Sequence, residues 1–282
     1  MLKIAIPNKG SLSKDAVELL LAAGYKCKRY GRELALYDNE NDIEFIFLRP
    51  RDIAVYVGNG TLDLGITGHD LLVDSEMEVV ELMKLNFGKS KFHYAVPNES
   101  SLLPANFSGQ KIATSYPNVV KKDLAKRGIN AKIIRLDGAV EISIRLGVAD
   151  VIADVVESGR TLKEAGLKIV GDTVLFSEAV LIARDKEITQ KNEIEILTER
   201  LRGILVARTH AMIEYDIPEN CLKAACNLTP GIESPTVSKL AKKDWLAVKS
   251  MVESNSANKI MDQLKKLGAK GIFISEIKSC RM

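Results

Sequence analysis

The chain has little that would mark it as a secreted or membrane protein. Its four cysteines, Cys27, Cys221, Cys226 and Cys280, form no CxxC pair and have no histidine at metal-ligand spacing, which predicts reduced thiols, not a zinc site or a disulfide framework. No apolar run approaches the roughly 18 residues that a membrane span needs. The N-terminal apolar stretch is interrupted by Pro7, which favours a first strand over a signal peptide. We therefore expect a cytoplasmic protein that does not bind membranes.

Aromatic residues and net charge are also scarce. Aromatics make up 5% of the 282 residues, and 40 Lys and Arg against 37 Asp and Glu leave a formal charge of +3. Such a chain is not expected to bind nucleic acid, which requires a basic surface or stacking aromatic rings. Phosphate groups would have to be bound by local groups of residues. The 46% of hydrophobic residues is typical of a folded chain with two or three domains.

Short apolar runs alternate with helix-type segments over most of the chain, which predicts an α/β fold with parallel sheets. We expect strands at 2–6, 43–48, 63–66 and 151–156, and helices at 13–23 and 186–202. Residues 4–8 are echoed by residues 112–118, and a lysine-bearing helix follows each segment. The echo indicates two similar lobes whose strand-end loops face one cleft. We expect residues 179–183 to return to the sheet of the first lobe.

The last part of the chain has a pattern of its own. It predicts strand 211–215, helix 218–227, strands 236–240 and 245–252, helix 257–267 and strand 271–277. This βαββαβ order is the ferredoxin-like arrangement. The arrangement alone does not identify a ligand.

The strongest local motif lies directly after the expected strand 151–156. Gly, Ser and Thr residues there lead into a helix, whose free amide groups and dipole favour a bound phosphate. An ordinary turn in which Ser158 or Thr161 caps the helix remains the alternative. The GxxxxGK[ST] pattern of P-loop nucleotidases is absent.

Charged residues at strand ends are further candidates. Asp154 lies within an apolar run, where an unpaired charge is costly, so we expect it to face a cleft. Glu141 falls in the first turn of a helix that begins near residue 137, where it either complements the helix dipole or binds a ligand hydroxyl. Asp70 is expected first as a helix cap, with a nucleobase amine as the alternative. Lys9 and Arg49, with Arg51 beside it, follow strands of the first lobe and suit an anion.

Covalent catalysis is not indicated. The three histidines, at 69, 93 and 210, have no nucleophile in a recognisable context, and no GxSxG motif is present. A helix-turn-helix segment is not visible either, which argues against a nucleic-acid-binding regulator.

Several motifs occur in order along the whole chain: LKIAIPNKGSLS, EFIFLRPRDIAVYVGNGTLDLGITGHDLL, IATSYPNVVKKDLAKRG, IRLDGAVEISIRLGVADVIADVVESGRTL and LTPGIESPT. With these motifs the chain resembles the long, histidine-regulated form of the ATP phosphoribosyltransferases. The resemblance implies a glycosyltransferase that moves the phosphoribosyl group of phosphoribosyl pyrophosphate to N1 of ATP, the first step of histidine biosynthesis. It also implies a two-lobe core like that of periplasmic binding proteins, followed by a ferredoxin-like regulatory domain.

The resemblance further implies roles for individual residues. Glu141 and Asp154 would be the catalytic acids beside the ribose hydroxyls. Phosphoribosyl pyrophosphate would be bound by Lys9, Glu157, Ser158, Gly159, Arg160 and Thr161. The nucleotide would be bound by Arg49, Asp70, Ser90 and Tyr116. Inhibitory histidine would be bound by Asp216, Ser234, Thr236 and Gly271. Mg²⁺ would be held mainly by the substrate phosphates, without a dedicated protein cage.

The expected domains are a discontinuous lobe I over 1–91 and 178–206, lobe II over 92–177, and a regulatory domain over 207–282. The resemblance implies a homo-oligomer that interconverts between dimer and hexamer. The alternative function, from a different class, is a non-catalytic two-lobe protein that binds a small phosphate ligand.

Overall fold

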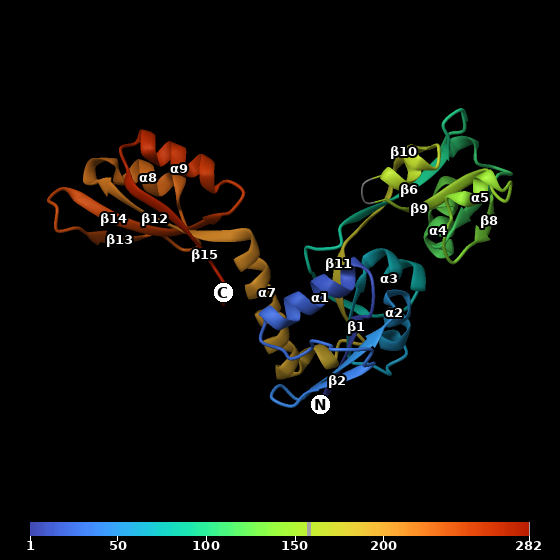
Figure 1. The fold of residues 1–282 in the computed structure, drawn as a ribbon, viewed down its shortest axis with the longest axis horizontal. Coiled ribbons are helices and arrows are strands. Elements are labelled where there is room, and N and C mark those ends of the chain that lie inside the picture. The colour runs from blue at the N-terminus through green and yellow to red at the C-terminus, as the bar shows by residue number, and fades with distance from the viewer. Residues whose placement is uncertain (157–158, 282) are drawn as a thin grey trace. The chain divides into compact units, whose positions relative to one another are not determined.

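The structure is a computed structural model that describes residues 1–156 and 159–281. The chain forms two compact units, unit 1 over Met1–Glu195 and unit 2 over Ile196–Met282 (Figure 1). Within the described residues, no helix combines the length and the apolar composition that a membrane span requires.

The first sheet of unit 1, which defines lobe I, has the strand order β2-β3-β1-β4-β11-β5. Its strands are β1 (Leu2–Pro7), β2 (Ala35–Asp38), β3 (Ile43–Leu48), β4 (Leu64–Gly68), β5 (Val80–Lys84) and β11 (Ala179–Ala183). The helices of lobe I are α1 (Ser11–Ala22), α2 (Pro50–Gly58) and α3 (His69–Ser75). Strands β4 and β11 are buried at every residue, as expected for central strands covered on both faces.

The second sheet, which defines lobe II, has the order β10-β6-β9-β7-β8. Its strands are β6 (Ser90–Pro97), β7 (Lys111–Thr114), β8 (Lys132–Arg135), β9 (Val151–Val156) and β10 (Leu167–Ser177). The helices are α4 (Pro117–Arg127), α5 (Ile142–Arg145) and α6 (Arg160–Glu164), with a 3₁₀ turn η1 (Pro104–Asn106). Phe92, Tyr94 and Phe107 are fully buried in a core under this sheet.

The chain passes between the two lobes twice. Strand β5 continues into β6, and β10 continues into β11 after the single residue Glu178. The two crossings are joined by backbone hydrogen bonds, because Ala179 N donates to Phe87 O at 2.9 Å. Strand β11 pairs with β4 and β5 of lobe I, which confirms the expected return of residues 179–183 to the first sheet.

Unit 2 contains a four-stranded antiparallel sheet of order β13-β14-β12-β15. Its elements are β12 (His210–Pro218), η3 (Glu219–Cys221), α8 (Leu222–Leu228), β13 (Thr236–Lys239), β14 (Trp245–Glu253), α9 (Ala257–Lys266) and β15 (Lys270–Glu276). Burial alternates along β12, so one face of the sheet packs on the helices and the other is open. The expected ferredoxin-like order is confirmed.

The long helix before unit 2's sheet differs from its expected bounds. It was expected at 186–202, but a 3₁₀ turn η2 (Ile188–Gln190) comes first and α7 runs over Asn192–Thr209. The helix continues through Gly203, where a side chain would collide with the carbonyl of Cys280. The Cys280 thiol also donates to Gly203 O at 3.3 Å. Glycine is therefore used here for close packing of the chain end, and it does not mark the end of the helix.

Candidate active site

A small pocket gathers four of the candidate residues from different segments of unit 1. This tyrosine pocket, of about 200 Å³, is lined by Lys9, Asp70, Ser90 and Tyr116, with Val155 from β9. Lys9 follows β1, Asp70 lies in α3, Ser90 begins β6, and Tyr116 precedes α4. The parallel strands of both lobes end near this pocket, which is where open α/β sheets bind ligands.

Asp70 does not cap its helix. Helix α3 has Gly68 at its N-cap position, and no side-chain cap is formed there. The buried Asp70 carboxylate instead accepts a hydrogen bond from Ser177 Oγ at 2.7 Å. Ser177 Oγ in turn accepts from the Asp70 amide at 2.9 Å, so the two residues are held in one geometry. The cap interpretation was wrong, because the tip of β10 lies closer to the carboxylate than the helix amides do.

Tyr116 is fixed from two sides. Its ring meets Phe92 edge-on at a centroid distance of 5.4 Å, and the Arg51 guanidinium lies 4.8 Å from the ring centroid. Burial and the neighbouring Asp70 carboxylate raise the pKa of the Tyr116 hydroxyl. The hydroxyl is therefore a neutral hydrogen-bonding group at physiological pH.

A second pocket brings the two candidate acids together. This acid pocket, of about 290 Å³, is lined by Glu141, Asp154, Val155, Gly159 and Thr161 among others. Burial raises the pKa of Asp154 to about 6, and nearby Glu141 raises it further, whereas the Val155 amide and Arg51 oppose the shift. The Val155 amide donates to Asp154 Oδ1 at 2.8 Å. Asp154 thus faces a cleft, as its position in an apolar strand predicts.

Glu141 stands just outside a helix. Helix α5 spans only Ile142–Arg145, and Glu141 occupies its N-cap position without a side-chain cap. The expected helix from residue 137 does not form, so the helix-dipole interpretation of Glu141 loses its basis. Its carboxylate is left to line the acid pocket.

The predicted phosphate loop is described in part. Glu157 and Ser158 lie outside the described residues. Gly159 has φ of 72° and is the N-cap residue of α6, a conformation that favours glycine. Thr161 therefore lies inside the helix, two residues after the N-cap, and does not cap it; it is exposed toward the acid pocket. Arg160 points elsewhere, with its Nε 2.7 Å from Glu164 Oε1.

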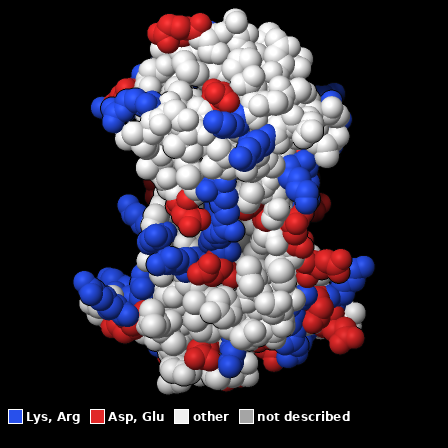
Figure 2. All heavy atoms as spheres, turned by 90° about the vertical axis from the view of Figure 1, so that its right-hand side faces the viewer, with Lys and Arg blue, Asp and Glu red and all other residues white. Residues whose placement is uncertain are grey.

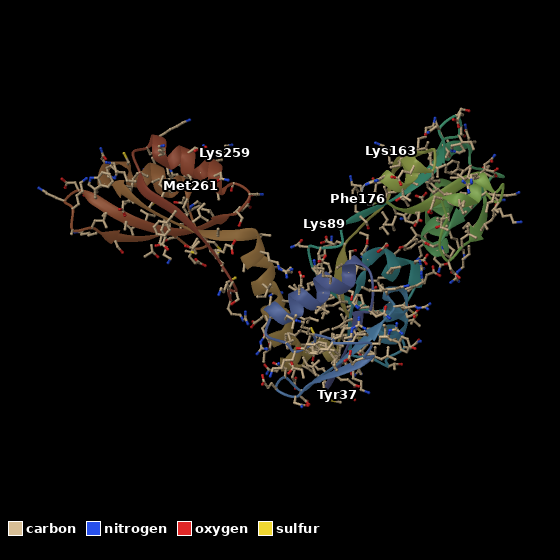
Figure 3. All side chains as sticks on the ribbon, in the orientation of Figure 1. Tyr37, Lys89, Lys163, Phe176, Lys259 and Met261 are labelled. Atoms are coloured by element: carbon tan, nitrogen blue, oxygen red, sulfur yellow. The ribbon has the colours of Figure 1, made fainter. Side chains whose placement is uncertain are left out.

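A third and larger cavity adjoins both pockets. This lysine pocket, of about 590 Å³, is lined by Lys84, Lys89 and Lys91, and it shares Ser90 with the tyrosine pocket and Gly159 with the acid pocket. Lys89 and the exposed ring of Phe176 lie close together where the lobes join (Figure 3). The lysines come from β5, β6 and the turn between them, and the sequence analysis did not identify them.

His93 also lines the lysine pocket. Its buried Nδ1 has no hydrogen-bond partner among the described residues, while Nε2 lies 3.3 Å from Thr173 Oγ1. Burial and nearby Lys91 lower the pKa of the imidazole, which keeps it neutral.

Two candidate arginines separate in the structure. Arg49 is exposed at the N-cap of α2 and lines none of the three pockets. Arg51, one turn further on, pairs with the buried carboxylate of Asp74 at 2.8 Å. Asp74 was missed in the sequence, although its spacing of four residues from Asp70 places both acids on one face of α3.

The candidate regulatory residues lie on the open face of the unit 2 sheet. Asp216, Thr236 and Gly271 line a shallow pocket of about 640 Å³ there. Ser234 is outside its lining, and its hydroxyl donates to Pro235 O at 3.3 Å. Three strands, β12, β13 and β15, contribute the three residues, so only the assembled sheet brings them together.

Comparisons with known proteins agree across the chain. A family model described as HisG, ATP phosphoribosyltransferase, matches residues 49–203, and one described as HisG, C-terminal domain, matches residues 207–279. The ATP phosphoribosyltransferase of Pseudarthrobacter chlorophenolicus is 54% identical, with 100% of both chains covered. That of Salinibacter ruber is 52% identical, again with 100% of both covered. Among solved structures, the ATP phosphoribosyl transferase (HisG:HisZ) complex from Thermotoga maritima has a TM-score of 0.63 at 28% identity, covering 72% of this chain and 96% of that chain.

Proposed function

Because the chain belongs to the ATP phosphoribosyltransferase family, we propose that it transfers the phosphoribosyl group of phosphoribosyl pyrophosphate to N1 of ATP in the cleft formed by the tyrosine and acid pockets. This is the first step of histidine biosynthesis. The observation that carries the assignment to this cleft is the shared lining: Val155 belongs to both pockets, so a nucleotide in one and a sugar in the other would be neighbours. Positioning of two reactants in this way supplies up to about 7–11 kcal/mol of catalysis in favourable cases.

The reaction needs no side chain as a base. Adenine N1 carries a free lone pair, which forms the bond to C1 of the sugar. The bond from C1 to pyrophosphate breaks, and its electron pair leaves with the pyrophosphate oxygen. This agrees with a site in which neutral Tyr116 and the hydrogen-bonded Asp70 offer only hydrogen bonds to a base.

Positive charge develops on the sugar as the bond to pyrophosphate breaks. We assign Asp154 and Glu141 to the stabilisation of this charge and to the ribose hydroxyls, because both carboxylates line the acid pocket. With a pKa of about 6, Asp154 is mostly ionised at pH 7.5 in the free enzyme. Its desolvation makes its charge more effective than it would be in water.

The phosphates need cationic and hydrogen-bonding partners. We assign the 5′-phosphate to the loop that contains Gly159 and Thr161, and other phosphates to Lys9. A magnesium ion would neutralise charge on the leaving pyrophosphate. The pocket fits an ion that enters on substrate phosphates, since the Glu141 and Asp154 carboxylates offer the oxygen atoms that Mg²⁺ and its bound waters prefer. In the described residues, no group of three or more His, Cys, Asp or Glu side chains is arranged to hold a metal.

Histidine is the proposed inhibitor, and unit 2 is its proposed binding unit. Asp216 offers a carboxylate to the amino group or imidazole, and Thr236 offers a hydroxyl on the same open face. We further propose that the enzyme interconverts between dimer and hexamer and that this change couples unit 2 to the cleft.

The test is pyrophosphate release from ATP, phosphoribosyl pyrophosphate and Mg²⁺, with and without millimolar histidine. Release should require both substrates and fall when histidine is added. Release that ignores histidine would remove the regulatory role of unit 2 but keep the enzyme. Nucleotide binding without release would favour a non-catalytic binding protein.

For the regulatory pocket, Asp216→Ala should raise the histidine concentration for half-inhibition at least tenfold while kcat changes less than twofold. Ser234→Ala is the matched control, because Ser234 does not line the pocket. Trp245, the single tryptophan of the chain, begins β14 of the same sheet and gives a fluorescence signal for histidine binding. Equal histidine sensitivity of Asp216→Ala and wild type would reject this placement.

A further inference from the structure

The carboxylate of Asp74 connects the two lobes. Asp74 lies in α3 of lobe I and is 5% exposed. Its Oδ2 accepts from Arg51 Nη1 at 2.8 Å, and its Oδ1 accepts from the amides of Asn118 and Val119 in α4 of lobe II, at 2.9 and 3.3 Å. The carbonyl of Asp74 accepts from Asn118 Nδ2 at 2.7 Å. One residue thus receives four hydrogen bonds, three of them from the other lobe.

These contacts make Asp74 a helix cap supplied by another lobe. Helix α4 begins at Pro117 after Tyr116, and Tyr116 provides no side-chain cap. Asn118 and Val119 are the second and third helical residues, whose amides a capping side chain normally satisfies. The Asp74 carboxylate takes that role, and its negative charge also suits the positive end of the helix.

The same carboxylate positions Arg51 against the nucleotide side of the cleft. Arg51 pairs with Asp74 while its guanidinium stacks 4.8 Å from the centroid of Tyr116, the residue directly before α4. A planar guanidinium held by a carboxylate has little freedom to leave an aromatic ring. Lys and Arg gather with Asp and Glu where the lobes meet on the face drawn in Figure 2, so a buried carboxylate that joins both lobes lies in a charged setting.

We propose that Asp74 is a positioning residue for the nucleotide: it holds the first turn of α4, and with it Tyr116, against lobe I, and so gives the tyrosine pocket its shape. The part concerning ATP rests on the proposed function, whereas the cap across the lobes does not. Asp74 is not part of the tyrosine pocket's lining and acts through Arg51 and Tyr116.

The test compares Asp74→Asn with Glu76→Gln in the full chain. Glu76 pairs with Lys122 of α4 at 3.2 Å, so this control removes an ion pair between the same two segments, but one whose side chains are each 48% exposed. A hydrogen bond to a charged group contributes about 1.5–3 kcal/mol, which corresponds to about a 10- to 150-fold change. We expect amide hydrogen exchange at Asn118 and Val119 to accelerate about tenfold or more in Asp74→Asn. Glu76→Gln should change it less than twofold.

The kinetic readout separates positioning from stability alone. In Asp74→Asn, KM for ATP should rise about tenfold, while KM for phosphoribosyl pyrophosphate and kcat change less than twofold. Asn118→Ala, which removes one bond to the Asp74 carbonyl and leaves the carboxylate in place, should raise KM for ATP in the same direction by a smaller factor. It serves as the second variant if Asp74→Asn does not fold.

The outcomes are distinct. Unchanged exchange at Asn118 and Val119 in folded Asp74→Asn would refute the cap across the lobes. Faster exchange with an unchanged KM for ATP would overturn the positioning role and leave a structural bond. A wild-type enzyme without pyrophosphate release would refute the proposed function and the kinetic part, while the exchange data would still decide whether the cap exists.

Discussion

Lobe I and lobe II share one strand plan but differ after the equivalent strand. Lobe I orders β3-β1-β4 as parallel strands and adds β11 and β5 antiparallel, and lobe II orders β8-β7-β9 and adds β6 and β10 in the same way. After β4, helix α3 follows at once and Asp70 is tied to Ser177. After β9, the predicted phosphate loop intervenes, and Asp154 lies in the acid pocket with a raised pKa.

The comparison shows how one scaffold can be divided between two roles. The strands fix where each carboxylate stands, but the segment after the strand decides its environment. In lobe I the carboxylate is satisfied by a hydroxyl and suits recognition. In lobe II it is desolvated and suits charge stabilisation.

The largest expected effect tests this difference directly. Asp154→Asn should lower kcat by about 10²–10³, the scale of losing one electrostatic group at a reacting centre. Asp70→Asn should lower kcat less than tenfold and act mainly on KM for ATP, because an amide oxygen can still accept from Ser177. Steady-state rates of pyrophosphate release measure both. Equal losses of kcat would remove the distinction between the lobes.

The same aspartate should leave a mark on stability. Its folded-state pKa of about 6 exceeds the ordinary value of 3.8, so folding favours the protonated form. The contribution is present below pH 4 and is lost as pH rises through 6, amounting to about 1–2 kcal/mol after allowance for partial exposure. Asp154→Asn should therefore be more stable than wild type at pH 7.5 and equal to it at pH 3.5. Urea unfolding at both pH values measures this, and a stability difference independent of pH would contradict it.

A smaller effect is expected for the loop of lobe II. Thr161→Val keeps the shape of the side chain and removes the hydroxyl exposed to the acid pocket. We expect kcat/KM for phosphoribosyl pyrophosphate to fall about tenfold, roughly the value of a hydrogen bond to a charged group, with the melting temperature unchanged. Thr189→Val is a matched control, since Thr189 bonds Lys186 O in the turn η2 and lines none of the pockets. An unchanged kcat/KM would reject the assignment of Thr161.

The smallest effect concerns the two cores. Tyr94 is fully buried in lobe II and donates from its hydroxyl to Asp123 Oδ2 at 2.8 Å, whereas the buried Phe45 of lobe I has no such polar group. Tyr94→Phe should reduce the free energy of unfolding by about 1 kcal/mol. Chemical denaturation of unit 1 reports the change, and a gain in stability would mean that burying the hydroxyl outweighs its bond.

The acid of the lobe II strand was accessible to sequence analysis, whereas its counterparts in lobe I were less so. An aspartate inside the apolar run of β9 has no favourable place except a cleft, and Asp154 is found there. Asp70 was recognised as a candidate, but its partner Ser177 lies 107 residues away. Arg51 and Asp74 were not connected, because the contact that explains them involves α4 of the other lobe.

By itself, the sequence determined the alternation of strands and helices, the return of residues 179–183 to lobe I and the ferredoxin-like order of unit 2. These follow from apolar runs, turn residues and periodicity, which act over neighbouring residues. Only the tertiary structure decided which polar groups meet: Asp70 with Ser177, Asp74 with the start of α4, and the three lysines around one cavity. The physical reason is that a buried polar group takes whatever partner the packed chain brings to it, and sequence distance does not limit that choice.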